Sequence, residues 1–96
     1  MKISEFQSLI KRLYLSKDLD RGIEKTFLWL VEELGELATL LKEDEINKQN
    51  VAEELADIIA WTTSIANILK INLEEAIKEK YPGKCKRCGF IPCQCD

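Results

Sequence analysis

Glycine and proline are almost absent from the first 81 residues, and this distribution constrains the fold more than any other feature of the sequence. Of four glycines and two prolines in the 96-residue chain, only Gly22 and Gly35 precede Pro82. A stretch so poor in turn formers and helix breakers is predicted to be mostly helical. The final segment, by contrast, holds all four cysteines. We therefore expect two units, a helical domain at 1–82 and a cysteine-rich tail at 83–96.

The spacing of apolar residues divides the first part into helices. Apolar side chains recur every three or four residues near the N-terminus and predict a helix over 4–15, with Ser4 and Gln7 forming a capping box at its start. Residues 16–22 collect turn-forming types and are predicted to be a turn.

Three further helices are expected after that turn. The apolar pattern predicts long helices over 23–43 and 48–70, followed by a short helix that Asn72 caps and that ends near Tyr81. The helix over 48–70 is apolar on two sides and rich in small residues, so it is expected to pack closely. The prediction is an all-α antiparallel bundle of about four helices per chain. Because so short a chain builds a limited core, we expect oligomerisation to complete the bundle.

Composition excludes several classes of function. No apolar run approaches the ~18–20 residues that span a bilayer, so no membrane partner is expected. The net charge of −3 lacks the basic excess that nucleic-acid binding needs. The N-terminal segment has no apolar signal sequence, which predicts a cytoplasmic protein. Histidine is absent, so any chemistry must use carboxylates, cysteines or bound ions.

Two pairs of acidic residues lie within apolar stripes of the predicted helices. Glu33 and Glu36 share a stripe with Trp29, whereas Glu54 and Asp57 share one with Trp61. Isolated glutamates usually belong to a solvated helix face, and that interpretation suits acids in polar surroundings. It suits these pairs poorly, because solvated acids are expected opposite the apolar face.

Both pairs have the same three-residue spacing, so an antiparallel hairpin of the two long helices would make the four carboxylates converge. Such a group is costly to bury unless protons or cations neutralise it. All-oxygen ligation suits Mg²⁺ or Mn²⁺. A di-iron bundle is excluded because that class needs histidine.

The segments Glu32-Glu33-Leu34-Gly35-Glu36-Leu37 and Glu53-Glu54-Leu55-Ala56-Asp57 resemble the EExxE and ExxD signature of the MazG family of all-α nucleotide pyrophosphohydrolases. This resemblance implies Mg²⁺-dependent hydrolysis of a nucleoside triphosphate to the monophosphate and pyrophosphate, and suggests house-cleaning of non-canonical nucleotides. It also implies a homodimer or homotetramer. The implied site contains Mg²⁺ ligands at Glu33, Glu36, Glu54 and Asp57, supported by Glu32.

Some roles in this implied site stay open. The group that removes the proton of the attacking water is left open between Glu32, Glu36 and metal-bound hydroxide alone. Trp29 and Trp61 are candidates for stacking on a nucleobase, although aromatic residues at helical spacing more often lie in a core or a subunit interface. Asn67 and Lys78 are further candidates for substrate binding. A non-catalytic nucleotide or metal sensor on the same fold is the alternative function, which the intact set of five acids disfavours.

The tail holds its cysteines in a C-x₂-C, x₄, C-x-C arrangement at Cys85, Cys88, Cys93 and Cys95. Four thiolates at this spacing predict a closed structural Zn²⁺ site of the zinc-knuckle type, with disulfides, free thiols or another metal as alternatives. The role of this element is left open between docking on a partner, regulating the active groove and stabilising the oligomer.

Overall fold

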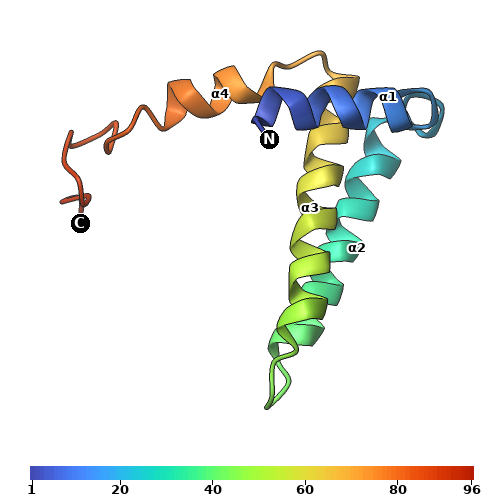
Figure 1. The fold of residues 1–96 in the computed structure, drawn as a ribbon, viewed down its shortest axis with the longest axis horizontal. Helices are drawn as coiled ribbons and strands as arrows, with labels where there is room; N and C mark the ends of the chain where they lie inside the picture. The colour runs from blue at the N-terminus through green and yellow to red at the C-terminus, as the bar shows by residue number, and fades with distance from the viewer.

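The computed structural model describes residues 1–96 and consists of four helices without a strand. They are α1 (Ile3–Arg21), α2 (Ile23–Leu41), α3 (Lys48–Ile68) and α4 (Leu73–Lys80). The prediction of an all-α chain with four helices is confirmed. The helices α2 and α3 form an antiparallel hairpin, α1 lies across one end of it, and α4 leads the tail away (Figure 1). No helix combines the length and hydropathy that crossing a bilayer requires.

The predicted turn at residues 16–22 is wrong, because α1 continues to Arg21. Asp18 is buried and accepts a 2.8 Å hydrogen bond from Arg21 Nη1 within the same helix. Arg21 Nη1 also lies 3.3 Å from Thr26 Oγ1 of α2. These contacts stabilise a last helical turn that its composition disfavours. The direction of the chain changes only at Gly22, whose φ of 91° and ψ of 162° few other residues adopt.

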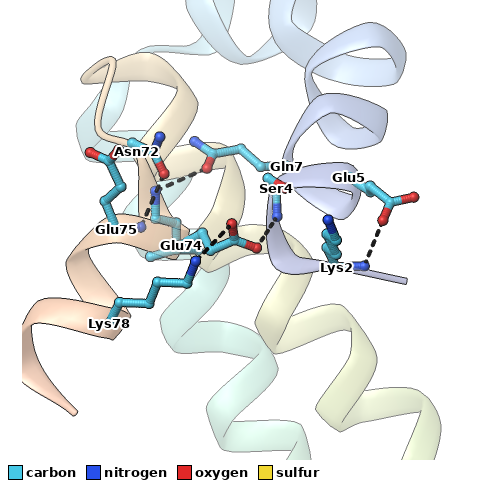
Figure 2. A network of polar contacts seen from close by, with 9 residues as sticks. Lys2, Ser4, Glu5, Gln7, Asn72, Glu74, Glu75 and Lys78 are labelled. Atoms are coloured by element: carbon cyan, nitrogen blue, oxygen red, sulfur yellow. Dashed lines mark hydrogen bonds and ion pairs between the residues drawn. The ribbon is translucent and has the colours of Figure 1, made fainter. Parts of the chain in front are cut away.

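The predicted capping box of Ser4 and Gln7 is also wrong. The helix begins one residue earlier than expected, and the Lys2 N–H donates to a Glu5 carboxylate oxygen at 3.1 Å. The Ser4 N–H instead donates to Glu74 of α4 at 3.2 Å, and the Gln7 side chain bonds to the α3–α4 junction (Figure 2). Both polar residues thus connect α1 to distant parts of the chain.

The other helix starts follow the sequence more closely. The Asn72 side chain accepts a hydrogen bond from the Glu75 N–H at 3.1 Å, which confirms the predicted cap of α4 (Figure 2). Asn47 caps α3 in the same way through the Asn50 N–H, also at 3.1 Å. Side-chain caps satisfy backbone donors that the first helical turn leaves free.

The register of the hairpin sets its opposing side chains. The ring centroids of Trp29 and Trp61 lie 5.5 Å apart. One turn along each helix brings Glu33 and Asp57 to the same cavity. A further turn brings Glu36 and Glu54 together. One face of the hairpin therefore carries an aromatic pair followed by two levels of acids.

The isolated chain buries little apolar surface. Only seven of its 96 residues are buried, and the apolar ones among them are Ile10 and Ala66. Several apolar side chains of α2 and α3 are instead 44–63% exposed: Phe27, Leu28, Val31, Leu34, Leu55 and Ile59. Exposed apolar patches on this scale commonly mark interaction sites.

Candidate functional site: a carboxylate cluster and a thiol cluster

Three carboxylates converge where α2 and α3 face each other. Glu33 and Glu36 extend from successive turns of α2 and Glu54 extends from α3, and one oxygen of each lies within 4.8 Å of the other two. The Oε2 atoms of Glu33 and Glu54 are buried without a hydrogen-bond partner. Buried acceptors without donors are unfavourable, so the arrangement of this cluster suits a neutralising cation.

The mutual repulsion of the cluster is visible at Glu54. A hydrogen bond shared with Glu33 raises the pKa of Glu54 to about 7, and desolvation and the nearby Glu36 act in the same direction. The metal-free cluster therefore holds a proton in acidic solution and loses it as the pH rises through about 7. A hard divalent ion can take that position, because carboxylate oxygens are its preferred protein ligands. The donor set fits Mg²⁺ or Mn²⁺.

The remaining two motif acids lie outside this group of three. Asp57 lines a cavity of about 380 Å³ together with Glu33 and Trp61, immediately beside the cluster. Glu32 is exposed on α2 and takes no part in the cluster. A ligand that contacts the three glutamates can also reach Asp57 through the shared cavity.

The two tryptophans contact each other and Arg21. Their rings are tilted by 49°, and the Arg21 guanidinium carbon lies 5.6 Å from the Trp29 centroid and 4.9 Å from that of Trp61. Cation–π attraction thus adds to the ion pair with Asp18 in fixing Arg21. Trp61 lines the cavity next to the acids, whereas Trp29 does not.

Asn67 and Lys78 lie apart from the acidic cavity. Asn67 is buried in the α1–α3 contact, where its side chain bonds to Gln7 at 3.1 Å. The Lys78 ammonium is exposed on α4 and lies 3.7 Å from Glu74 (Figure 2). Within one chain, neither side chain lines the cavity beside Glu33.

Sequence reasoning missed Asp18 and Arg21, which line the cavity with Glu33 and Trp61. Their three-residue spacing is the signal of an ion pair along a helix. The turn-like composition of residues 16–22 concealed that signal, because it directed attention away from a helix at this position.

The tail brings its four cysteines together. The sulfurs of Cys85 and Cys95 are 3.7 Å apart, those of Cys88 and Cys93 are 4.0 Å apart, and those of Cys85 and Cys93 are 3.5 Å apart. A tetrahedral ion with metal–sulfur bonds of ~2.3 Å separates its ligands by roughly 3.8 Å. The four thiols therefore fit a tetrahedral site, and they are free of disulfide bonds.

Backbone amides contact several of these sulfurs. The Gln94 N–H donates to Cys88 Sγ and the Cys95 N–H to Cys93 Sγ, each at 3.3 Å. Amide donors, first that of Cys88, lower the pKa of Cys85 to about 6, while contact with the Cys93 and Cys85 thiols raises the pKa of Cys95 to about 11. The tail thus favours the thiolate at Cys85 and disfavours it at Cys95, and a divalent cation bound to all four sulfurs would neutralise their shared negative charge.

Comparison with known proteins agrees with this geometry. The family model described as the MazG nucleotide pyrophosphohydrolase domain matches residues 21–89, which contain all three clustered glutamates and Asp57. No curated protein matched the chain. Since the match spans more than half of the sequence, the chain belongs to the MazG nucleotide pyrophosphohydrolase family.

Proposed function

We propose that this protein is a Mg²⁺-dependent nucleoside triphosphate pyrophosphohydrolase that converts a triphosphate and water into the monophosphate and pyrophosphate. The observation that carries the proposal is the convergence of Glu33, Glu36 and Glu54, with two buried oxygens that have no partner. Such a site needs a cation, and a triphosphate brings one. Membership of the MazG family supports the same reaction.

In the proposed mechanism, Glu33, Glu36 and Glu54 would hold Mg²⁺, with Asp57 of the adjoining cavity as a further ligand. The bound ion supplies charge neutralisation at the phosphates and acidifies water. Water attacks one of the two phosphorus atoms joined by the α–β bridging oxygen, the bond from that phosphorus to the bridging oxygen breaks, and the monophosphate and pyrophosphate separate. The carboxylates position the phosphates, and their fixed places on two helices limit the reorganisation that this requires.

The acceptor of the water's proton is a separate question. We propose that Glu36 or Glu32 takes this proton, and their replacement by glutamine distinguishes the two. Glu32 is exposed and outside the cluster, so unchanged turnover in Glu32→Gln would remove it from the reaction. Loss of the acidic limb of the rate profile in Glu36→Gln, with Mg²⁺ binding retained, would identify Glu36 as the base.

The nucleoside is proposed to occupy the cavity that Trp61 lines beside Glu33 and Asp57. An aromatic wall next to a phosphate site suits a nucleobase. Trp29 would support the Trp61 ring through their 5.5 Å contact. Asn67 and Lys78 contribute to substrate binding in this proposal only if a second chain brings them to the site, because they line no part of this cavity within one chain.

A homodimer or homotetramer is proposed as the working form. Its basis is the exposed apolar face of α2 and α3, which includes Leu28 at 63% and Ile59 at 56% exposure. Light scattering at micromolar concentration tests this point, and a well-folded monomer would contradict it.

The tail is proposed to bind structural Zn²⁺ through its four cysteines, whose mutual distances suit tetrahedral coordination. Metal analysis after gentle purification is expected to find one zinc per chain. Four reactive thiols without zinc would exclude this assignment.

Pyrophosphate release from a panel of ordinary and modified triphosphates tests the main proposal. With Mg²⁺ we expect turnover of at least one nucleotide, and preference for modified bases would support cytoplasmic house-cleaning. Nucleotide binding without turnover would favour a sensor and overturn the enzymatic proposal.

A further inference from the structure

The cavity beside the acidic cluster contains a buried carboxylate that no step of the proposed reaction uses. Asp18 lines this cavity with Glu33, Asp57 and Trp61, and its side chain is only 2% exposed. One of its oxygens accepts the 2.8 Å bond from Arg21. The other, Oδ2, is buried and has no hydrogen-bond partner. An unpaired charged acceptor at this depth calls for a donor that the chain itself does not supply.

The contacts around Asp18 restrict what that donor is. A phosphate is disfavoured at Asp18 itself, because two anions would meet there, although Lys17 and Arg21 also line the cavity. A second divalent cation is disfavoured, since the Arg21 guanidinium already lies beside Asp18 and is fixed by two tryptophan rings. Asp18 also lies outside the group of three carboxylates that can share an ion. The ligand that suits these charges is a neutral group that donates a hydrogen bond through N–H or O–H.

The position of Asp18 indicates which part of a nucleotide carries this group. The aromatic side chains of Tyr14 and Trp61 line the same cavity as Glu33, the one clustered glutamate that reaches it. A triphosphate held by the glutamates therefore directs its nucleoside toward Asp18. Deamination replaces the exocyclic amino group of cytosine or adenine with a carbonyl and places a hydrogen on the adjacent ring nitrogen. At the position of the amino group, the oxo base would therefore put two acceptors in contact with each other, and only its ring N–H could still donate to Asp18.

We infer that Asp18 is a specificity-determining residue that selects nucleotides whose base presents an amino group, and disfavours the corresponding oxo bases. This inference rests on the proposed function. Arg21 acts as a positioning residue, because it occupies one Asp18 oxygen and so leaves the other for the substrate. A site built around a hydrogen bond rejects analogues that cannot make it far better than an apolar pocket rejects a change of size.

The experiment compares kcat/KM within pairs of triphosphates that differ by amino and oxo groups, CTP with UTP and ATP with ITP. In the wild type, the amino member of the better-accepted pair is expected to be favoured by about 10- to 100-fold, the range of a buried hydrogen bond lost to an unpaired acceptor. Equal values, or a preference for the oxo member, would overturn the inference without any variant.

Asp18→Asn provides a matched switch. The amide oxygen can still accept from Arg21, while the amide nitrogen replaces Oδ2 and presents a donor to the base. The amino-to-oxo ratio is expected to fall at least about 10-fold, mainly through loss of the amino substrate. Asp20→Asn, which removes the same charge from an exposed position of α1, is expected to keep the wild-type ratio.

Three readouts separate the possible causes. Tryptophan fluorescence reports whether Arg21 stays over Trp29 and Trp61 in Asp18→Asn, so a structural effect is recognised. If Asp18→Asn changes the ratio of kcat/KM between ribose and deoxyribose substrates but leaves the amino-to-oxo ratio unchanged, Asp18 recognises the sugar. That result would overturn the inference. If the wild type hydrolyses no triphosphate, the proposed function fails, and preferential binding of CMP over UMP, lost in Asp18→Asn, still decides the role of Asp18.

Discussion

The carboxylate cluster and the thiol cluster assemble anionic side chains by opposite means. Glu33, Glu36 and Glu54 are contributed by two long helices, and the aromatic pair and Arg21 fix these helices one turn away. The cysteines come from eleven consecutive positions, Cys85 to Cys95, in a segment without a helix. The first site is therefore held by packed helices, whereas the second, if it binds the proposed Zn²⁺, is expected to depend on that ion for order.

This difference determines which function each site can perform. A prepared site with unpaired oxygens retains free binding capacity for substrate, as catalysis requires. A closed set of four thiolates uses all of its coordination positions for structure. Changes in the two regions are expected to act independently, and the following experiments test that separation in order of decreasing effect.

Replacing Glu54 by Gln is expected to have the largest effect, a loss of kcat/KM of at least about 100-fold. Changes outside a metal's ligand shell already cost about 10- to 100-fold, and Glu54 is proposed as a direct ligand. Pyrophosphate release at saturating Mg²⁺ measures the loss. The control Glu43→Gln removes an exposed acid just after α2 and is expected to retain activity. Activity within threefold of wild type in Glu54→Gln would contradict the proposed site.

Replacing Cys88 by Ser is expected to weaken zinc binding at least about 10-fold, while the α1–α3 unit keeps its thermal transition. Zinc titration and far-UV circular dichroism measure the two parts separately. Lys86→Ser changes a residue between the cysteines and is expected to retain both the zinc affinity and the thermal transition. A common collapse of zinc binding and helical structure in Cys88→Ser would show that the tail supports the helical unit after all.

Much of this architecture could be predicted from the sequence, because helical periodicity is local. The hairpin, the Asn72 cap and the family signature depend on residues that lie within one or two turns of each other. The extension of α1 through residues 16–21 could not be predicted, because Arg21 bonds to Thr26 and lies over Trp61, forty positions away. Tertiary contacts of this kind override local propensity.

The same reasoning explains which site residues were found. Glu33, Glu36, Glu54 and Asp57 follow from spacing on two helices, and the structure brings the three glutamates together. Asp18 lies on α1, a helix that the sequence-based prediction ended too early. Asp18 reaches the cavity because α1 crosses one end of the α2–α3 hairpin, which the local sequence pattern does not predict (Figure 1).

Gly22 and Gly83 offer a matched comparison between the two regions, since both have a φ of 91°. Gly22→Ala is expected to lower the free energy of unfolding by ~1–3 kcal/mol, because its backbone conformation is nearly restricted to glycine and joins α1 to α2. Gly83→Ala strains only the start of the tail and is expected to leave the unfolding of the helical unit unchanged. Chemical denaturation measures both. Equal losses would mean that the two regions unfold together.

The smallest effect concerns pH and the proton that substitutes for a cation. Because the folded state raises the pKa of Glu54 from 4.5 to about 7, the proton stabilises the metal-free protein fully below about pH 4.5, and this stabilisation is lost as pH rises through about 7. The melting temperature of metal-free protein is therefore expected to fall between pH 5 and pH 8. The effect is modest, since solvent screens a partly exposed cluster.

Three comparisons assign this pH dependence to Glu54. Glu54→Gln, which cannot lose a proton, is expected to flatten the profile between pH 5 and pH 8. Mg²⁺ is expected to raise the melting temperature more at pH 8 than at pH 5, because protons compete with the cation at the lower pH. Glu74, whose pKa is lowered by the Ser4 N–H, contributes only in more acidic solution and so does not mimic this behaviour. A pH profile unchanged by Glu54→Gln, with equal Mg²⁺ shifts at both pH values, would show that packing alone, without proton or cation, accommodates the prepared cluster.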